Sequence, residues 1–213
     1  AKGKLTIFMP YGFARLIREQ FIPDFLKSYP QVHLNLNIVD DLKAYLDDPF
    51  DCMIFPHIKG VPLPDFTLVA KTILFSEVGI YATPTYLKEY GRPNTPTDLN
   101  SHNCVAAFSG QWPFKQSTGK LNFKAVSGNI SVNNDSVLKS LVMNHQAIGY
   151  TYSRLFKDEA ANKEVVSVLN DYTNLQVEVY ALYPQSYYIP YKLKVFLNML
   201  QAYYLEAAIC KTS

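Results

Sequence analysis

Histidine, cysteine and acidic side chains, which carry much enzyme chemistry, form no recognisable catalytic set in this sequence. Four histidines are scattered along the chain, and none is adjacent in sequence to a carboxylate or a cysteine: His33, His57, His102 and His145. Motifs for dinucleotide binding, P-loop phosphate binding, zinc peptidases, serine hydrolases and calcium loops are also missing. The sequence therefore predicts no enzyme, no cofactor and no metal site, and the histidines are interpreted as structural or solvated.

Two further groups of reactive side chains have simple structural interpretations. Asp47, Asp48 and Asp51 could pair as carboxylates, but they lie where a predicted helix ends and a strand begins, which favours a solvated turn. The odd number of cysteines, with no C-x-x-C pair, argues against disulfides and a zinc site and favours a reducing compartment. Cys52 and Cys104 are expected to be buried inert thiols, with redox sensing as the open alternative.

Two positions where a predicted strand gives way to a helix could instead bind a ligand. The segment Pro10-Tyr11-Gly12-Phe13 follows one strand, and Asn134-Asp135 opens a later helix. Ligands of open α/β sheets bind beyond the carboxyl ends of the strands, where glycine permits close approach and helix N-termini offer free N–H groups. Plain helix capping without a ligand is an equal alternative at both positions.

Hydrophobic periodicity predicts an α/β protein in which strands and helices alternate. Strands are expected at 5–9, 33–38, 51–55, 67–75, 78–82, 105–108, 125–132 and 177–183. Helices are expected at 13–25, 42–46, 137–142 and 193–204. The strand at 51–55 is expected to end at Pro56 in a loop. Strands separated by helices of this length imply βαβ units and a layered sheet.

The composition is that of an ordinary globular protein. The chain has 213 residues, 48% of them apolar, and 20 Lys and Arg against 18 Asp and Glu give a net charge of +2. No apolar run reaches the roughly 18 residues that a membrane span needs. No block of basic residues provides the stripe that duplex DNA requires, so these residues alone are not expected to bind DNA. Aromatic residues are frequent, at 14%.

Short motifs follow one another along the chain in a characteristic order. The first are Gly3-x-Leu5-x-Ile7-x-x-Pro10, Phe25-Leu26-x-x-Tyr29-Pro30-x-Val32-x-Leu34 and Phe50-Asp51-x-x-Ile54. Next come Ala82-x-Pro84-x-Tyr86-Leu87 and Gly91-x-Pro93-x-x-Pro96-x-Asp98-Leu99-x-x-His102-x-Cys104. The last are Asn133-Asn134, Ile148-Gly149, Leu169-x-Asp171-Tyr172 and Val179-Tyr180-Ala181-x-Tyr183-Pro184. In this order and spacing, nearly the whole chain resembles the effector-binding domain of LysR-type transcriptional regulators.

The resemblance implies two αβ subdomains joined by two crossover strands, as in type 2 periplasmic binding proteins, with a small molecule held in the cleft between them. The crossings are placed near 80–82 and 181–183. Subdomain I then comprises 1–80 plus 184–213, and subdomain II comprises 81–183. A winged helix-turn-helix and a linker helix are expected to precede Ala1, outside this chain.

Family positions around the cleft carry unusual residues in this chain. Gly12 stands where the family commonly has Ser or Thr, Phe55-Pro56-His57 replaces Arg-x-Gly, and His145-Gln146-Ala147 replaces Gly-x-Gly. The expected ligand-binding residues are Tyr11, Gly12, Phe13, Phe55, Pro56, His57, Phe108, Ser109, Asn134 and Tyr150. With Tyr152, these aromatics would make a cleft suited to a flat or apolar effector, although about half of them could pack into the subdomain cores instead.

The resemblance implies a cytoplasmic bacterial sensor module that transmits effector binding to DNA through the geometry of a homodimer or homotetramer, with RNA polymerase as a further partner and no membrane. In this family, the first subdomain of one protomer contacts the second subdomain of its partner, and these contacts would bury the helix near Phe13 and the strand 33–39. Leu34, Leu36 and Ile38 are then expected to face the core. The alternative is a secreted solute-binding protein of an ABC transporter, and an enzyme on the same scaffold is a distant third.

Overall fold

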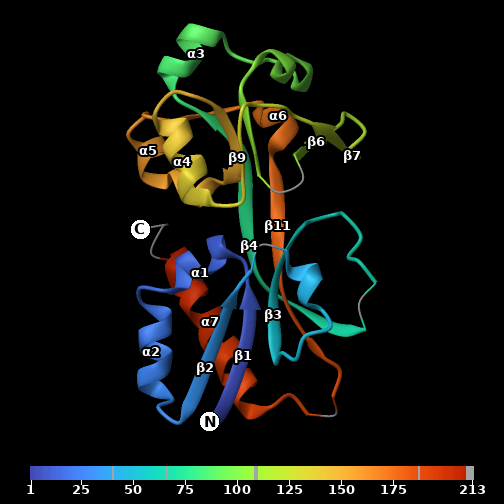
Figure 1. Ribbon diagram of the computed structural model, residues 1–213, viewed down its shortest axis with the longest axis vertical. Helices are drawn as coiled ribbons and strands as arrows, with labels where there is room; N and C mark the ends of the chain where they lie inside the picture. Colours follow the sequence, from blue (N-terminus) through green and yellow to red (C-terminus); the bar gives the residue numbers. More distant parts are fainter. Residues whose placement is uncertain (40, 66, 108–109, 187, 210–213) are drawn as a thin grey trace. The chain divides into compact units, whose positions relative to one another are not determined.

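The chain folds into two compact α/β units that share two long strands (Figure 1). The computed structural model describes residues 1–39, 41–65, 67–107, 110–186 and 188–209. The first unit comprises Ala1–Phe75 and Glu178–Ser213, and the second comprises Ser76–Val177. The chain passes from one unit to the other within β4 (Leu68–Ala82) and returns within β11 (Leu175–Pro184). The α/β fold class expected from the sequence is confirmed.

The first unit is built on a sheet whose leading strands are parallel. Its remaining elements are β1 (Gly3–Met9), α1 (Tyr11–Ile17), α2 (Phe21–Ser28), β2 (Val32–Ile38), the 3-10 helix η1 (Leu42–Tyr45), β3 (Cys52–Ile58) and α7 (Tyr191–Ile209). The strand order is β2-β1-β3-β11-β4. β1 pairs in parallel with β2 along its whole length and with β3 at Ile7↔Cys52 and Phe8↔Met53.

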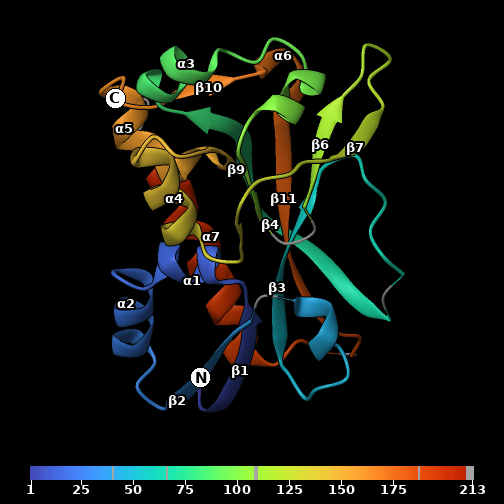
Figure 2. The same cartoon turned by 45° about the horizontal axis from the view of Figure 1, so that its top comes forward.

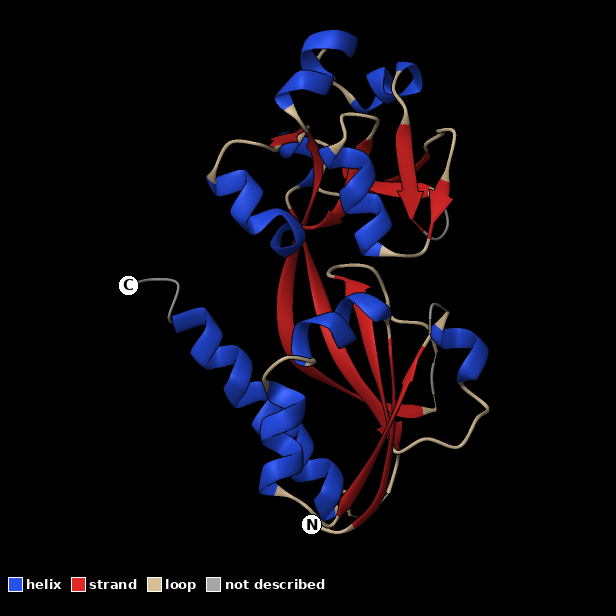
Figure 3. Cartoon of the chain, turned by 60° about the vertical axis from the view of Figure 1, so that its left-hand side comes forward, coloured by secondary structure: helices blue, strands red, loops and turns tan. Residues whose placement is uncertain are grey.

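Helices α2 and α7 lie on one side of this sheet (Figure 3), and they pack together through aromatic rings. The ring of Phe196 lies 5.2 Å from Phe21 and 5.1 Å from Phe25, in both cases edge to face. All three side chains are fully buried, and such contacts add to the hydrophobic gain from burial.

Among the described residues, none of the helices has the length and the hydropathy that a membrane span requires.

Several expected elements of this unit differ in the structure. The helix expected over 13–25 is broken at residues 18–20 into α1 and α2. Apolar residues four apart drift by about 40° per step around a straight helix, so one long helix would turn its apolar stripe away from the sheet. Ile38, expected in the core, is 52% exposed because β2 is an edge strand. The helix at 42–46 is only the single turn η1, for which Asp41 supplies the cap.

The strand expected to end before Pro56 instead continues as β3 to Ile58, so the prediction of a loop there is wrong. Proline lacks the N–H that a strand ladder uses and is tolerated only where that donor is not needed. β1 ends at Met9 and pairs with β3 only as far as Met53, so Pro56 lies beyond that ladder. Phe55, Pro56 and His57 are therefore strand residues.

The second unit has a mixed sheet and a separate hairpin. Its elements are α3 (Pro84–Tyr90), η2 (Pro96–Ser101), β5 (Cys104–Ala107), β6 (Gln111–Lys115), β7 (Leu121–Ala125), β8 (Ser131–Val132), α4 (Asp135–Met143), β9 (Ile148–Tyr152), η3 (Ser153–Phe156), α5 (Lys157–Ala161), β10 (Val166–Val168) and α6 (Asn170–Thr173). The sheet order is β4-β9-β5-β8, with β10 also on β4. β9, β5 and β8 are parallel, whereas β4 runs antiparallel to β9. The strand expected over 125–132 is split between β7 and β8.

Two apolar clusters cover the two faces of this sheet, one beneath the β6–β7 hairpin and one beneath α4, and both of these elements are labelled in Figure 2. One contains Trp112 and Phe114 of the β6–β7 hairpin with Ile148 of β9. The other contains Leu138 and Val142 of α4. The hairpin and α4 therefore hold the parallel strands between them, and this fixes where the strand ends emerge.

Candidate functional site

Six of the residues expected to bind a ligand lie at one end of the parallel strands of the first unit. Tyr11, Gly12 and Phe13 begin α1 directly after β1, and Phe55, Pro56 and His57 form the last half of β3. Continuing the register Phe8↔Met53 by two residues places Pro10 level with Phe55. The structure thus brings two segments together that are more than forty residues apart in sequence.

These residues differ in how far they are buried. The Phe13 ring is 5% exposed and packs 6.0 Å from Tyr204 of α7. Phe55 is 7% exposed and belongs to an apolar cluster that includes Phe8 and Leu182. Tyr11, Gly12, Pro56 and His57 are partly exposed. The exposed members are therefore accessible to a ligand, and the two phenylalanines form the packing behind them.

His57 is oriented by its own loop. Its Nε2 lies 3.1 Å from the carbonyl oxygen of Val61 and 3.2 Å from that of Pro62. Because both partners only accept hydrogen bonds, Nε2 must carry a proton, so in the neutral form of the ring Nδ1 is the acceptor. The ring also stacks at 5.9 Å on Phe55. Among the described residues, His57 Nδ1 has no hydrogen-bond partner, and the ring lies on an aromatic surface.

Asn134 and Tyr150 lie at the corresponding end of the parallel strands in the second unit. Tyr150 is on β9, one residue beyond the pair Val105↔Gly149 that joins β9 to β5, and Asn134 follows β8. Asn134 Oδ1 accepts N–H bonds from Ser136 at 2.9 Å and Val137 at 3.3 Å, so Asn134, rather than Asp135, caps α4. Phe108 and Ser109, which directly follow β5, lie outside the described residues.

Tyr150 is paired with a residue that the sequence did not single out, Trp112. Their rings lie 5.8 Å apart, with Trp112 only 1% exposed. The hydroxyl of Tyr150 and the indole N–H of Trp112 are both buried and have no hydrogen-bond partner among the described residues. Burial raises the pKa of Tyr150 and of the neighbouring Tyr152, so both phenols stay protonated and can donate. The signal for Trp112 in the sequence was only that it is the single tryptophan.

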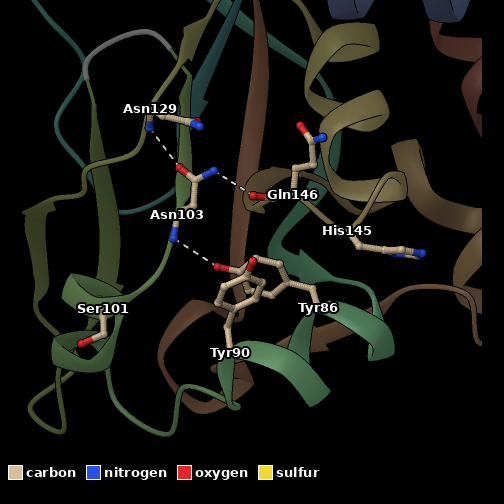
Figure 4. A pocket seen from close by; sticks show the side chains of 7 residues that line it. All are labelled: Tyr86, Tyr90, Ser101, Asn103, Asn129, His145 and Gln146. Carbon is tan, nitrogen blue, oxygen red and sulfur yellow. Dashed lines mark hydrogen bonds between the residues drawn. The ribbon is translucent and has the colours of Figure 1, made fainter.

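A pocket of about 580 Å³ lies at the opposite ends of the same strands of the second unit (Figure 4). Its lining residues are Tyr86, Tyr90, Ser101, Asn103, Asn129, His145 and Gln146. Asn103 directly precedes β5, and Gln146 lies two residues before β9. No sequence pattern predicts this pocket, because its residues come from four separate segments with no shared motif.

The two cysteines within the described residues are buried in the cores. Cys52 and Cys104 are both 0% exposed. Burial raises the pKa of the Cys52 thiol far above its usual range and that of Cys104 to about 12. Reaction with oxidants requires the thiolate, so this geometry favours inert thiols. Among the described residues, no three His, Cys, Asp or Glu side chains gather as a metal site would require.

Comparison with known proteins points to one family. The family model described as "LysR substrate binding domain" matches residues 1–204. The chain is 26% identical over 207 residues to the probable HTH-type transcriptional regulator LtrA of Klebsiella pneumoniae and 27% identical over 207 residues to an uncharacterized HTH-type regulator, YcaN, of Escherichia coli. These matches cover 94% and 93% of this chain but only 65% of each relative, so the chain spans just under two thirds of their length.

Solved structures show the same fold. The full-length Vibrio cholerae virulence activator AphB aligns with a TM-score of 0.77 at 20% identity, covering 94% of this chain and 68% of that one. The regulatory domain of CrgA from Neisseria meningitidis aligns with a TM-score of 0.74 at 20% identity, covering 95% of this chain and 98% of that domain. These matches support the type 2 periplasmic-binding-protein-like fold, and the matched relatives, named as transcriptional regulators, do not support a transporter component.

Proposed function

This chain belongs to the LysR substrate-binding domain family, and from that membership we propose that it is the effector-binding domain of a bacterial LysR-type transcriptional regulator. The observation that carries the proposal is the family match over residues 1–204, which includes nearly every element of both units. The relatives are HTH-type regulators longer than the matched region. We therefore assign DNA binding to a helix-turn-helix domain of the same protein and its place of action to the cytoplasm.

The effector is bound by the residues at the carboxyl ends of the parallel strands. In the first unit these are Tyr11, Gly12, Pro56 and His57, backed by Phe13 and Phe55. In the second unit they are Tyr150 and the region around Asn134. This proposal is supported by the general rule that open α/β sheets bind ligands at strand carboxyl ends.

The exposed and half-buried side chains of this set favour a flat, largely apolar effector with a few hydrogen-bonding groups. Tyr11 and Tyr150 supply aromatic surface, and the His57 ring stacks on the ring of Phe55. The polar contacts available are His57 Nδ1 as acceptor and the Tyr150 hydroxyl as donor. None of these side chains is a carboxylate or a lysine or arginine, so a multiply charged effector would find no counter-charge within this set.

Regulation requires that the effector distinguish two states of the protein. A ligand that binds the DNA-competent and the DNA-incompetent states with equal affinity does not change the equilibrium between them, however tightly it binds. We assign the difference between the states to the geometry of a homodimer or homotetramer, with RNA polymerase as a further contact of the whole protein.

The test is a thermal-shift screen of the full-length regulator, followed by DNA-binding measurements. Aromatic and heteroaromatic compounds are expected to raise the melting temperature, and those compounds should change the affinity of the protein for its own promoter DNA in fluorescence anisotropy. A protein that binds no promoter DNA would contradict the assignment as a regulator. A response only to small polar anions would contradict the effector class while leaving that assignment intact.

A further inference from the structure

The pocket at the amino ends of β5 and β9 has walls that the protein holds in place by its own hydrogen bonds (Figure 4). Asn103 makes a hydrogen bond through each end of its side-chain amide: Nδ2 donates to the carbonyl of Gln146 at 2.7 Å, and Oδ1 accepts from the backbone N–H of Asn129 at 3.0 Å. Its backbone N–H donates to the Tyr86 hydroxyl at 3.1 Å. One residue therefore joins three walls of the pocket, and a preorganised site loses little entropy on binding.

Two backbone features reinforce this frame. Gly128 lies so close to β5 that a Cβ atom there would stand 2.2 Å from the carbonyl oxygen of Cys104. His145 adopts a left-handed backbone with φ of 60°, and its Nδ1 lies 2.8 Å from the hydroxyl of Thr83. Strained or crowded backbone is retained only where the surrounding structure imposes it. The walls at Asn129 and His145 are thus set by the fold.

One side of the pocket is an aromatic platform. The rings of Tyr86 and Tyr90 lie 4.7 Å apart at an angle of 31°. Tyr86 is buried and anchored, whereas Tyr90 is 54% exposed at the end of α3. An exposed ring fixed on a buried one offers a flat surface on which the C–H face of another ring can stack.

The other sides carry neutral polar groups with unused hydrogen-bonding capacity. The side chains of Ser101, Asn129 and Gln146 are exposed and make no hydrogen bond to other described residues. A side-chain amide both donates and accepts, and a hydroxyl does the same. These are groups that match ligand hydroxyls, which also donate and accept.

The lining residues include no aspartate, glutamate, lysine or arginine. The charged groups that adjoin the lining are of opposite sign. The neighbouring Glu89 carboxylate raises the pKa of the Tyr90 phenol, and Lys124 Nζ donates to Asn100 Oδ1 at 2.6 Å. A free anion or cation would therefore gain little binding free energy in this pocket. An apolar ligand would leave the side-chain amides of Asn129 and Gln146 without hydrogen-bond partners.

We propose that this pocket is a second ligand site, separate from the effector residues, which binds an uncharged, hydroxyl-rich ring such as a hexopyranose. The ring stacks on Tyr90, and its hydroxyls bond to Ser101, Asn129 and Gln146. The volume of about 580 Å³ is within the range of small-molecule sites and accommodates a monosaccharide. Because β5 and β9 run from this pocket to the effector end of the same unit, a sugar bound here stabilises the strands that carry Tyr150.

The test is an NMR titration of the isotope-labelled 213-residue chain with the methyl α-glycosides of glucose, galactose and mannose. At least one glycoside should shift the side-chain amide signals of Asn129 and Gln146 in a saturable way. Tyr90→Ala should weaken that binding roughly five- to tenfold, as loss of a ring contact does, while Tyr90→Phe, which keeps the ring, should retain it. Tyr188→Ala removes an aromatic residue that is 86% exposed in the other unit and should change nothing.

Three results would overturn the proposal. They are no amide shift with any of the three glycosides, equal binding by the Tyr90→Ala variant, and tighter binding of glucose 6-phosphate or uridine than of every glycoside. The His57→Ala and Tyr150→Phe variants should titrate like the unmodified chain, so this site and the effector site are tested independently.

Discussion

Asp51 Oδ1 lies 2.7 Å from Lys192 Nζ, and this ion pair joins the start of β3 to the first turn of α7. The second carboxylate oxygen of Asp51 accepts the backbone N–H of Thr6 at 2.8 Å, and Lys192 also donates to the carbonyl of Lys4. Both charged side chains are 22% exposed. Asp51 is therefore a structural link between β1, β3 and α7, and the sequence-based interpretation of a solvated turn is wrong for this residue.

Asp51→Ala should lower the free energy of unfolding by about 1–3 kcal/mol, because it leaves the Thr6 N–H and the Lys192 ammonium without their partner. Urea denaturation followed by circular dichroism measures the change. Asp48→Ala is the matched control, since Asp48 is exposed, and it should stay within about 0.5 kcal/mol of the parent. Equal effects of the two substitutions would show that the link contributes nothing to stability.

Cys52 and Cys104 should resist alkylation in the folded protein. Both are fully buried with raised thiol pKa values, so the thiolate that reacts is scarce at neutral pH. Iodoacetamide labelling with peptide-resolved mass spectrometry should find both cysteines modified only after denaturation. Rapid labelling or sulfenic acid formation at either cysteine under native conditions would revive the redox-sensing alternative.

Stability should decline as the pH rises above about 8.5, where unfolded thiols begin to ionise. Burial raises the thiol pKa of Cys104 to about 12 and that of Cys52 still higher, so the native state keeps protons that the unfolded chain releases. The unfolded state then binds fewer protons, and the free energy of unfolding falls by up to about 1.4 kcal/mol per pH unit for each such group. Tyr150 and Tyr152 add to the loss above about pH 10.

Urea denaturation between pH 7 and about pH 10 measures whether the free energy of unfolding falls as the pH rises. The Cys104→Ala variant should show a shallower decline between about pH 8.5 and pH 10 than the parent, since it lacks one of the two buried thiols found among the described residues. A stability that rises with pH over this range would contradict the assignment of buried neutral thiols.

Tyr150→Phe should weaken effector binding about five- to tenfold, because it removes a buried donor hydroxyl and keeps the ring. The probe is the compound that gives the largest thermal shift with the full-length protein, and calorimetry gives its affinity. Tyr172→Phe, on a ring packed against the same apolar cluster, is the control and should bind like the parent. Equal affinity of all three proteins would remove Tyr150 from the effector site.

Gly128→Ala should destabilise the second unit by more than about 3 kcal/mol or prevent its folding, since the added Cβ would stand 2.2 Å from the Cys104 carbonyl oxygen. Gly119→Ala is the comparison: Gly119 has a φ of 83° but nothing within 4 Å of its Cβ position. Its substitution should cost only the backbone strain, about 1–2 kcal/mol. Thermal denaturation shows which of the two variants loses more stability. A larger loss for Gly119→Ala than for Gly128→Ala would contradict the close approach at Gly128.

The sequence by itself determined the fold class and the position of the main elements of the first unit, and the order of its motifs indicated the family. Local patterns suffice for these features, because alternation along β1 and the apolar run of β3 reflect burial that each segment needs wherever it packs. The strand-end segments at Tyr11 and Asn134 were also recognised, since turn and cap residues mark them locally.

Only the tertiary structure decided which distant residues meet. Lys192 joins Asp51 across 141 positions, and Asn103 ties together segments that include Asn129 and Gln146. Such contacts depend on strand order and register, which are set by packing of whole faces and leave no periodic trace in any one segment. For the same reason Ile38 is exposed despite its alternating pattern: an edge strand has a covering neighbour on one side only, and no local signal says which strand lies at the edge.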